Sequence, residues 1–328
     1  MITPSDLVRL PFSPDLTLGG VTYACRSLPH TYDRMGGSDM QRLRRIVAGK
    51  AAELAFRRHL AAHQVPYDTL GATPFTDPDQ YDVALGGRRC DLKSFLVYDK
   101  QVIHRIKADP SELLRADALV PSEQAMSDSL HPQDLFIFAF TTALLTPHSQ
   151  DLQRAMAAEQ PVFLLHALPE AWRRPAFWAS LGRLALKSEC SRPVTLELGG
   201  QGAQREFRSQ EVTLSPGVRT EAGDDLYALS YLRAPAILDG RVGVSSPRLG
   251  EAHIVCPQDW GNIWVYGLEI FLCGYMPCAE FRRKARHLPA GSRVWQYPRT
   301  RVKNLALPVA ELRPMGALFD AAQAWSKT

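Results

Sequence analysis

The fold of this chain is decided by residues 80–97, which read QYDVALGGRRCDLKSFLV. The runs 80–85 and 88–97 have the character of strands, and only Gly86 and Gly87 separate them. Two glycines between two strand patterns predict a β-hairpin, because both central positions of a type I′ turn need positive φ. We therefore expect two paired strands joined by a two-residue turn.

The turn also predicts which residues face each other across the hairpin. Counting outward from the glycines places Asp82 directly opposite Asp91. Because side chains alternate between the two faces of a strand, Lys93 lies on the same face as Asp91, opposite Gln80. Two acids and one base are thus expected side by side.

This pair of acids predicts a metal site. Like charges directly opposite in a sheet, with Cβ atoms about 4.5 to 5.5 Å apart, are destabilising unless something neutralises them. A cation bound to Asp82 and Asp91 would do so, and Mg²⁺ uses one or two carboxylates together with waters and substrate phosphate. Lys93 would then lie beside the metal, where it can orient or deprotonate an attacking water and stabilise charge on a phosphate.

A helix is predicted before the hairpin, over residues 38–63, with Ser38 or Asp39 as its N-cap. Glu53 lies seven residues from both Ile46 and Leu60, so its carboxylate should point inward with the apolar stripe. A buried Glu is unfavourable unless it is paired or metal-bound, which makes it a candidate ligand or supporting base near the hairpin. The apolar stripe is formed by Leu43, Ile46, Val47, Leu54 and Leu60.

The pattern of elements predicts an α/β sandwich. Residues 135–140 are continuously apolar, as expected of a strand buried on both faces of a sheet. A helix, several strands, more helix and a buried strand follow one another in the order expected of such a sandwich. We expect four regions, namely an irregular N-terminal arm with at most one strand (1–37), the core (38–147), a β-rich insertion or second domain (148–258) and a C-terminal return to the core (259–328).

Composition narrows the possible classes of protein. The chain has 328 residues, 45% apolar and 22% charged, as in an ordinary soluble globular protein. A net charge of +4 is too small to indicate nucleic-acid binding without local clustering. The start of the chain lacks a secretory pattern, and the longest apolar run, 135–145, is about half of the roughly 20 residues that span a membrane. We expect a cytoplasmic protein without membrane contact and with reduced cysteines.

A basic segment lies near the C-terminus, where residues 281–310 contain no acid. Arginine, lysine and aromatic residues are the types that phosphate contacts and base stacking need, so this segment is a candidate nucleic-acid site, with a solvated surface as the equal alternative. Its members are Arg282, Arg283, Lys284, Arg286, Arg293, Arg299, Arg301 and Lys303, with Trp295 and Tyr297 among them. A second set on the predicted helix, Arg42, Arg45, Arg57 and Arg58, is better explained as a solvated face.

The sequence favours neither a zinc site nor several common catalytic motifs. His253, Cys256, Cys273 and Cys278 have spacings that loosely suit zinc, but no tight Cys-x-x-Cys pair is present, so buried thiols are the preferred interpretation. The sequence also lacks the phosphate-binding G-x-x-x-x-G-K-[ST] loop, the G-x-S-x-G elbow and the H-E-x-x-H motif. The commonest ATPase, serine hydrolase and metalloprotease classes are therefore disfavoured.

The hairpin and its surroundings resemble the PD-(D/E)XK nuclease superfamily, over roughly residues 38–145. The resemblance is carried by Gly49-x-x-x-Glu53 on a helix, Tyr81-Asp82 on one strand, Asp91-Leu92-Lys93 on the next, and the buried strand 135–140. Tyr81 stands where the family name has proline. The family's core runs helix, three-stranded meander, helix and strand, and its second acid and lysine are spaced (D/E)-x-K.

The resemblance implies a restriction-endonuclease-like α/β fold, with a mixed central sheet flanked by helices, and hydrolysis of phosphodiester bonds in DNA or RNA. It places Mg²⁺ or Mn²⁺ on Asp82, Asp91 and the carbonyl of Leu92, with Lys93 at the attacking water. It also suggests a restriction or phage-defence endonuclease whose region 148–258 recognises substrate, a partner or an activating signal. The expected partners are nucleic acid and either a protein partner or a homo-oligomer. The alternatives are a non-catalytic nucleic-acid-binding or assembly protein that uses residues 282–303, and a metal-dependent phosphoesterase acting on a small nucleotide.

Overall fold

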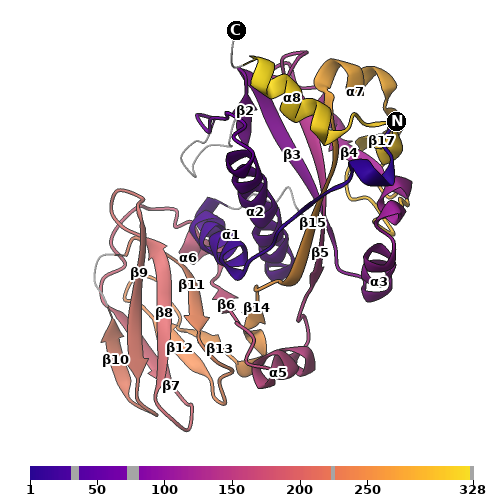
Figure 1. The fold of residues 1–328 in the computed structure, drawn as a ribbon. Coiled ribbons are helices and arrows are strands. Elements are labelled where there is room, and N and C mark those ends of the chain that lie inside the picture. The colour runs from indigo at the N-terminus through magenta and orange to yellow at the C-terminus, as the bar shows by residue number, and fades with distance from the viewer. Residues whose placement is uncertain (31–36, 72–80, 223–225, 326–328) are drawn as a thin grey trace. The chain divides into compact units, whose positions relative to one another are not determined.

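The computed structural model describes residues 1–30, 37–71, 81–222 and 226–325. The protein is mixed α/β, and its chain divides into two compact units (Figure 1). We call them unit 1 (Met1–Gly20, Ala48–Leu145 and Val265–Thr328) and unit 2 (Val21–Val47 and Thr146–Trp264).

Unit 1 contains a mixed five-stranded central sheet in the order β1-β15-β5-β3-β2. Strands β3 and β5 are parallel, and each of the other neighbouring pairs is antiparallel. Every residue of β5 except Leu144 is buried, which confirms the strand predicted from the apolar run. The strands are β1 (Val8–Leu10), β2 (Val83–Leu85), β3 (Arg88–Val97), β5 (Leu135–Leu144) and β15 (Tyr266–Pro277).

The predicted hairpin and its register are confirmed. Gly86 and Gly87 have φ of 53° and 75°, and the strands pair Val83 with Cys90. Strand β2 begins at Val83, later than the predicted start, and Gln80 lies outside the described residues. Before the hairpin, Asp68 forms a single antiparallel bridge with Ala84.

The long helix before the hairpin, α2 (Asp39–Ala62), is also as predicted. It lies beside β3 in Figure 1. A Cβ added to Gly49 would lie 3.6 Å from Ser94 Oγ, so the helix backbone comes close to the strand at this point.

The prediction of an irregular N-terminal arm is wrong, because residues Pro14–Ser27 form helix α1. Gly19 and Gly20 lower the apparent helix propensity of this stretch. A Cβ on Gly19 would come within 2.6 Å of Leu54 Cδ1, so the glycine serves close packing against α2. The burial of Leu16 compensates for the low helix propensity of the two glycines, because tertiary packing commonly overrides intrinsic propensity.

The remaining elements of unit 1 enclose a core rich in phenylalanine, in which Phe136, Phe138 and Phe281 are fully buried against one another. A second, antiparallel sheet has the order β16-β17-β4. Its strands are β4 (Asp117–Pro121), β16 (Arg286–Leu288) and β17 (Asn304–Pro308). The helices are α3 (Lys100–Ala108), α4 (Ser122–Ala125), α7 (Cys278–Lys284) and α8 (Met315–Trp325), with 3₁₀ turns η1 (Pro4–Asp6), η4 (Pro110–Arg115) and η6 (Val309–Glu311).

Unit 2 adds two sheets, in the orders β10-β7-β12-β13 and β14-β6-β11-β8-β9, around an aliphatic core. Their strands are β6 (Leu164–Ala167), β7 (Leu184–Ser188), β8 (Val194–Gln201), β9 (Phe207–Leu214), β10 (Arg219–Ala222), β11 (Ala228–Ala234), β12 (Val242–Ser245), β13 (His253–Val255) and β14 (Gly261–Asn262). The helices are α5 (Ser149–Ala157) and α6 (Glu170–Arg173), with 3₁₀ turns η2 (Leu28–His30) and η5 (Pro257–Asp259). Across the described ranges, no helix combines the length and apolarity that crossing a membrane requires.

Candidate functional site

Asp91 and Lys93 project from the same face of β3 and contact each other, as the alternation of side chains predicts. Lys93 Nζ lies 2.7 Å from Asp91 Oδ1 and 2.6 Å from Oδ2. Gln124 of α4 joins them, because its Nε2 donates to Asp91 Oδ2 at 2.6 Å and its Oε1 accepts from Lys93 Nζ at 2.8 Å. The acid, the base and the amide form a closed hydrogen-bonded triad.

Asp82 lies immediately before β2 and turns its carboxylate toward the backbone of β3. Its N–H donates to Cys90 O at 3.1 Å, and its Oδ2 accepts from Leu92 N–H at 2.7 Å. Among the described residues it has no cationic partner. Burial, followed by the negative charges of Asp91 and Glu53, raises the pKa of Asp82 from 3.8 to about 7.

Glu53 is buried on the inward face of α2, with 7% of its surface exposed. Its carboxylate forms ion pairs with Lys50, at 2.7 Å, and with Arg57. Arg57 also donates to the carbonyl of Asp82 at 2.8 Å. Glu53 is therefore neutralised by cations, and it orients an arginine that holds the start of the hairpin.

The three carboxylates do not form a preassembled three-ligand metal site. In the described part of the chain, no three His, Cys, Asp or Glu side chains are grouped so as to hold a metal ion. Lys50 and Arg57 pair with the two oxygens of Glu53, as Lys93 and Gln124 contact those of Asp91, so a direct metal bond from Glu53 stays a prediction. Asp82 and Asp91 offer a pair of hard oxygen donors, and burial, followed by the negative charges of Asp91 and Glu53, raises the pKa of Asp82. This donor set fits a divalent cation.

Gln124 is a site residue that the sequence did not indicate. It lies 31 residues beyond Lys93, in a four-residue helix, and no spacing rule connects the two positions. Only the packing of β4 and α4 brings its amide to Asp91 and Lys93, in the middle of β3.

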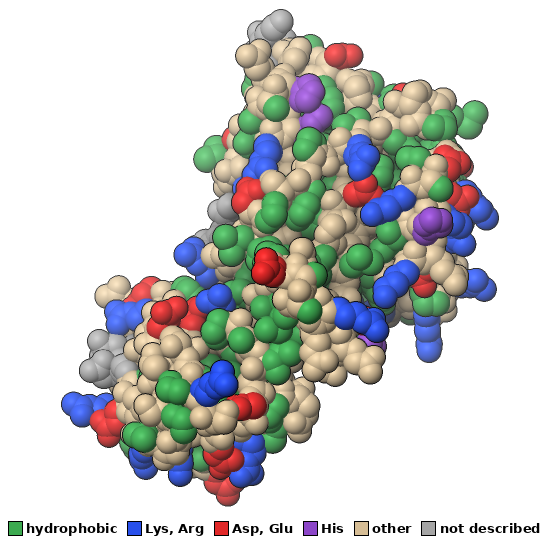
Figure 2. Space-filling view, turned by 60° about the horizontal axis from the view of Figure 1, so that its bottom comes forward, with side chains coloured by type: hydrophobic (Ala, Val, Ile, Leu, Met, Phe, Trp, Pro, Cys, Tyr) green, Lys and Arg blue, Asp and Glu red, His purple; other side chains and the backbone are tan. Residues whose placement is uncertain are grey.

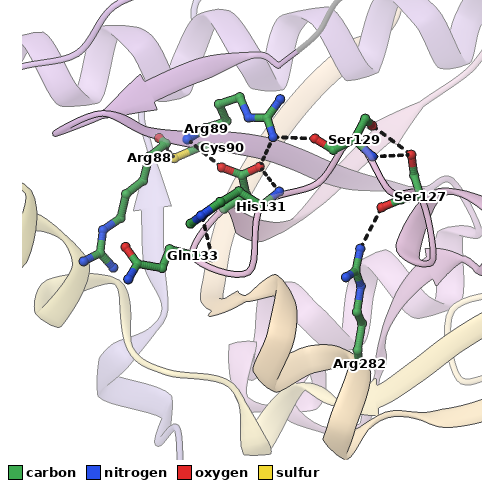
Figure 3. A network of polar contacts seen from close by, with 9 residues as sticks. Arg88, Arg89, Cys90, Ser127, Ser129, His131, Gln133 and Arg282 are labelled. Atoms are coloured by element: carbon green, nitrogen blue, oxygen red, sulfur yellow. Dashed lines mark hydrogen bonds and ion pairs between the residues drawn. The ribbon is translucent and has the colours of Figure 1, made fainter.

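The loop that follows Gln124 is held by two arginines. Figure 3 shows Arg282 reaching Ser127 and Arg89 reaching Ser129. Arg282 Nε and Nη2 donate to the carbonyls of Ala125 and Ser127 at 2.6 and 2.9 Å. Arg89 contacts the carbonyl of Ser129 and forms an ion pair with a buried acid, Asp134. Arg282 therefore supports α4 from within unit 1, a role that the basic-segment pattern did not suggest.

We expect Arg282→Ala to destabilise the protein by about 2 to 4 kcal/mol, because two charge-assisted hydrogen bonds to carbonyls are lost. Urea denaturation measures this free energy of unfolding. Arg283→Ala, at the exposed neighbouring position, is the matched control and should change it by less than about 0.5 kcal/mol. Equal effects of the two substitutions would contradict the role assigned to Arg282.

Other members of the basic segment vary in their surroundings. Lys284 is paired with Glu280, and Arg286 with Asp117, both at 2.8 Å. Exposed positions that could meet a ligand are Arg283, Arg293, Arg299, Arg301 and Lys303. The four arginines of helix α2 also have partners within the protein. Arg42, Arg57 and Arg58 form ion pairs with Asp39, Glu53 and Asp15, and Arg45 donates to the carbonyl of Gln41.

The loose zinc pattern has no counterpart in the structure. Cys273 and Cys278 are buried in unit 1, whereas His253 and Cys256 belong to unit 2. Burial raises the pKa of the Cys278 thiol to about 12 and also raises that of Cys273. The prediction of buried thiols is confirmed for Cys273 and Cys278, whereas Cys256 is only half-buried.

The chain was compared with protein-family models, curated proteins and solved structures, and none of them matches it.

Proposed function

We propose that this protein is a metal-dependent nuclease that hydrolyses phosphodiester bonds of DNA or RNA. The observation that carries the proposal is the placement of the Asp91–Lys93–Gln124 triad beside Asp82, a carboxylate without a cationic partner among the described residues. A buried carboxylate with a raised pKa, next to a second carboxylate and a lysine, is the kind of group that a phosphodiester hydrolase needs.

The order of elements supports a restriction-endonuclease-like core. Helix α2 precedes the β2–β3 hairpin, helix α3 follows it, and β5 then pairs with β3 in parallel. The bridge between Asp68 and Ala84 corresponds to the first strand of the expected meander. Unit 2, with its two sheets, is the part of the chain that we assign to recognition of substrate or of a partner.

The resident metal would be Mg²⁺ or Mn²⁺, held by Asp82, Asp91 and the carbonyl of Leu92. When bound, it supplies Lewis-acid activation of water and neutralises charge on the phosphate. Lys93 orients the attacking water and stabilises the developing negative charge, while Gln124 holds the lysine and Asp91 in register. Glu53 acts through Arg57, which fixes the backbone at Asp82.

The direct test is cleavage of supercoiled plasmid and of single-stranded RNA by the purified full chain with Mg²⁺, Mn²⁺ or EDTA. We expect products with either metal and none with EDTA. Cleavage that is equal in EDTA, or its absence with both metals on both substrates, would count against the proposal.

Gln124 gives a more specific prediction. Gln124→Leu keeps the size of the side chain but removes both hydrogen bonds, so the rate of cleavage should fall about 10- to 100-fold. The effect should appear in kcat more than in KM, because the amide orients the reacting groups without binding substrate. Gln124→Glu is the informative partner, since an added carboxylate beside Asp91 should tighten Mn²⁺ binding measured by calorimetry. An unchanged kcat in Gln124→Leu would exclude this positioning role.

A second candidate function is non-catalytic nucleic-acid binding. It is favoured by the observation that Lys93, Asp91 and Gln124 already satisfy one another, as in a structural cluster. This alternative predicts nucleic-acid binding that persists in EDTA and no metal-dependent cleavage.

A further inference from the structure

A separate pocket in unit 1 is lined mainly by arginine and tryptophan. Its volume is about 440 Å³, within the range of small-molecule sites. Four segments of the chain build it, namely α3, η4, β4 and the turn that contains Trp295. The lining residues are Arg105, Arg115, Asp117, Arg293, Val294 and Trp295.

This pocket is held in place by buried contacts. The amide of Gln296, 9% exposed, donates to Asp117 O at 2.6 Å and accepts from Asp117 N–H at 3.3 Å. The indole of Trp295 meets the ring of Phe140 edge-on in the core, with ring centroids 6.5 Å apart. The turn that carries Trp295 is therefore fixed to both sheets of unit 1 rather than free on the surface.

The charge of the pocket is positive. Three arginines line it against one acid, Asp117, whose charge is already matched by Arg286 at 2.8 Å. Glu112 pairs with Arg115 at 3.1 Å and lies 3.6 Å from Arg105, which orients two of the guanidinium groups. Arg293 makes no hydrogen bond or ion pair to any described residue. Three arginines and the single charge of Glu112 leave a net surplus of about two positive charges that an anion could neutralise.

A phosphomonoester carries about −1.5 to −2 charges and three acceptor oxygens, which suits this surplus and the fork geometry of arginine. Trp295 adds an aromatic surface, and stacking of a base on such a ring contributes about 1 to 3 kcal/mol in nucleic-acid complexes. Neither a bare anion nor an apolar ligand would use both features.

We propose that this pocket binds a nucleoside monophosphate, with its phosphate among the three arginines and its base against Trp295. The ligand is either a free nucleotide or the phosphorylated end of a nucleic-acid strand. Lys and Arg side chains also gather on the right-hand side of Figure 2, the side on which α3, α7 and β4 lie in Figure 1. The inference deepens the proposed function, but it concerns binding alone and can fail or hold separately from catalysis.

Binding is measured by calorimetry on the full chain in EDTA, so that no cleavage occurs. Adenosine 5′-monophosphate is the probe, with adenosine and inorganic phosphate as partial ligands. We expect the nucleotide to bind at least about tenfold more tightly than adenosine. Arg293→Gln should lower the affinity for the nucleotide at least about fivefold. Trp295→Phe should lower the affinity for the nucleotide and leave that for inorganic phosphate unchanged.

Arg283→Gln is the matched control, because Arg283 is exposed in the same basic segment but does not line the pocket. Oligonucleotides of one sequence with a 5′-phosphate or a 5′-hydroxyl distinguish the two sources of ligand. A preference for the phosphorylated strand identifies a strand end, and binding of the nucleotide alone identifies a free nucleotide.

Equal affinities for adenosine and its monophosphate, or an Arg293→Gln protein that binds like the wild type, would overturn the inference. The Asp91→Asn protein should bind the nucleotide with the affinity of the wild type. Nucleotide binding can therefore be interpreted even if the proposed nuclease activity is not found.

Discussion

Asp91→Asn is expected to lower the rate of Mg²⁺-dependent cleavage by about 10³-fold or more. The substitution removes one of two carboxylates that would hold the metal, and removal of a charge-stabilising group from such a centre commonly has an effect of this size. It also releases Lys93, whose ammonium lies within 2.7 Å of both oxygens of Asp91. Initial rates on plasmid and RNA measure the effect, and calorimetry with Mn²⁺ should show weaker metal binding.

Lys93→Gln separates the role of the metal ligand from that of the lysine. The glutamine side chain retains a hydrogen bond to Asp91 but carries no positive charge, so cleavage should fall about 10²- to 10⁴-fold. Metal affinity should be kept or increased, because a competing cation has been removed from the carboxylate. Asp320→Asn, an exposed acid on α8, is the control for both variants and should behave like the wild type. Full activity in Asp91→Asn would remove this centre from consideration.

The hairpin was predictable because its turn leaves little freedom. A two-residue Gly-Gly loop fixes the register, and every side chain on both strands then has a defined face. That Asp91 and Lys93 share a face follows from the alternation of side chains along β3, but their direct ion pair was not part of the predicted metal site. The buried strand β5 was equally predictable, since an apolar run of that length suits a strand covered on both faces.

The partners of the site residues were not predictable in the same way. Burial of Glu53 followed from its helical position, but its pairing with Lys50 and Arg57 depends on rotamers that sequence spacing does not specify. Gln124 reaches Asp91 through the packing of a second sheet, and Arg282 reaches α4 from a segment 157 residues away. Helix α1 was missed because the fit of Gly19 against Leu54 is a property of tertiary packing.

The raised pKa of Asp82 has a consequence for stability. The folded state holds a proton on this carboxyl up to a pH of about 7, whereas the unfolded chain releases it near 3.8. The folded state therefore binds more protons between these values, and stability falls as the pH rises through this window. The loss is complete about one pH unit above this pKa of about 7, and it amounts to about 4 kcal/mol at most, because a pKa unit corresponds to about 1.4 kcal/mol.

Asp82→Asn should accordingly stabilise the metal-free protein at pH 8 by up to about 4 kcal/mol and have little effect at pH 4. The amide oxygen of Asn can still accept the hydrogen bond from Leu92 N–H, while the uncompensated charge is gone. Urea denaturation in EDTA at several pH values measures the difference in free energy of unfolding. With Mn²⁺ added at pH 8, the wild type should gain stability by mass action and Asp82→Asn should gain little. A stabilisation that is the same at pH 4 and pH 8, or absent at both, would show that ionised Asp82 does not destabilise the folded state. The strongest physical reason for placing a cation at this site would then be lost.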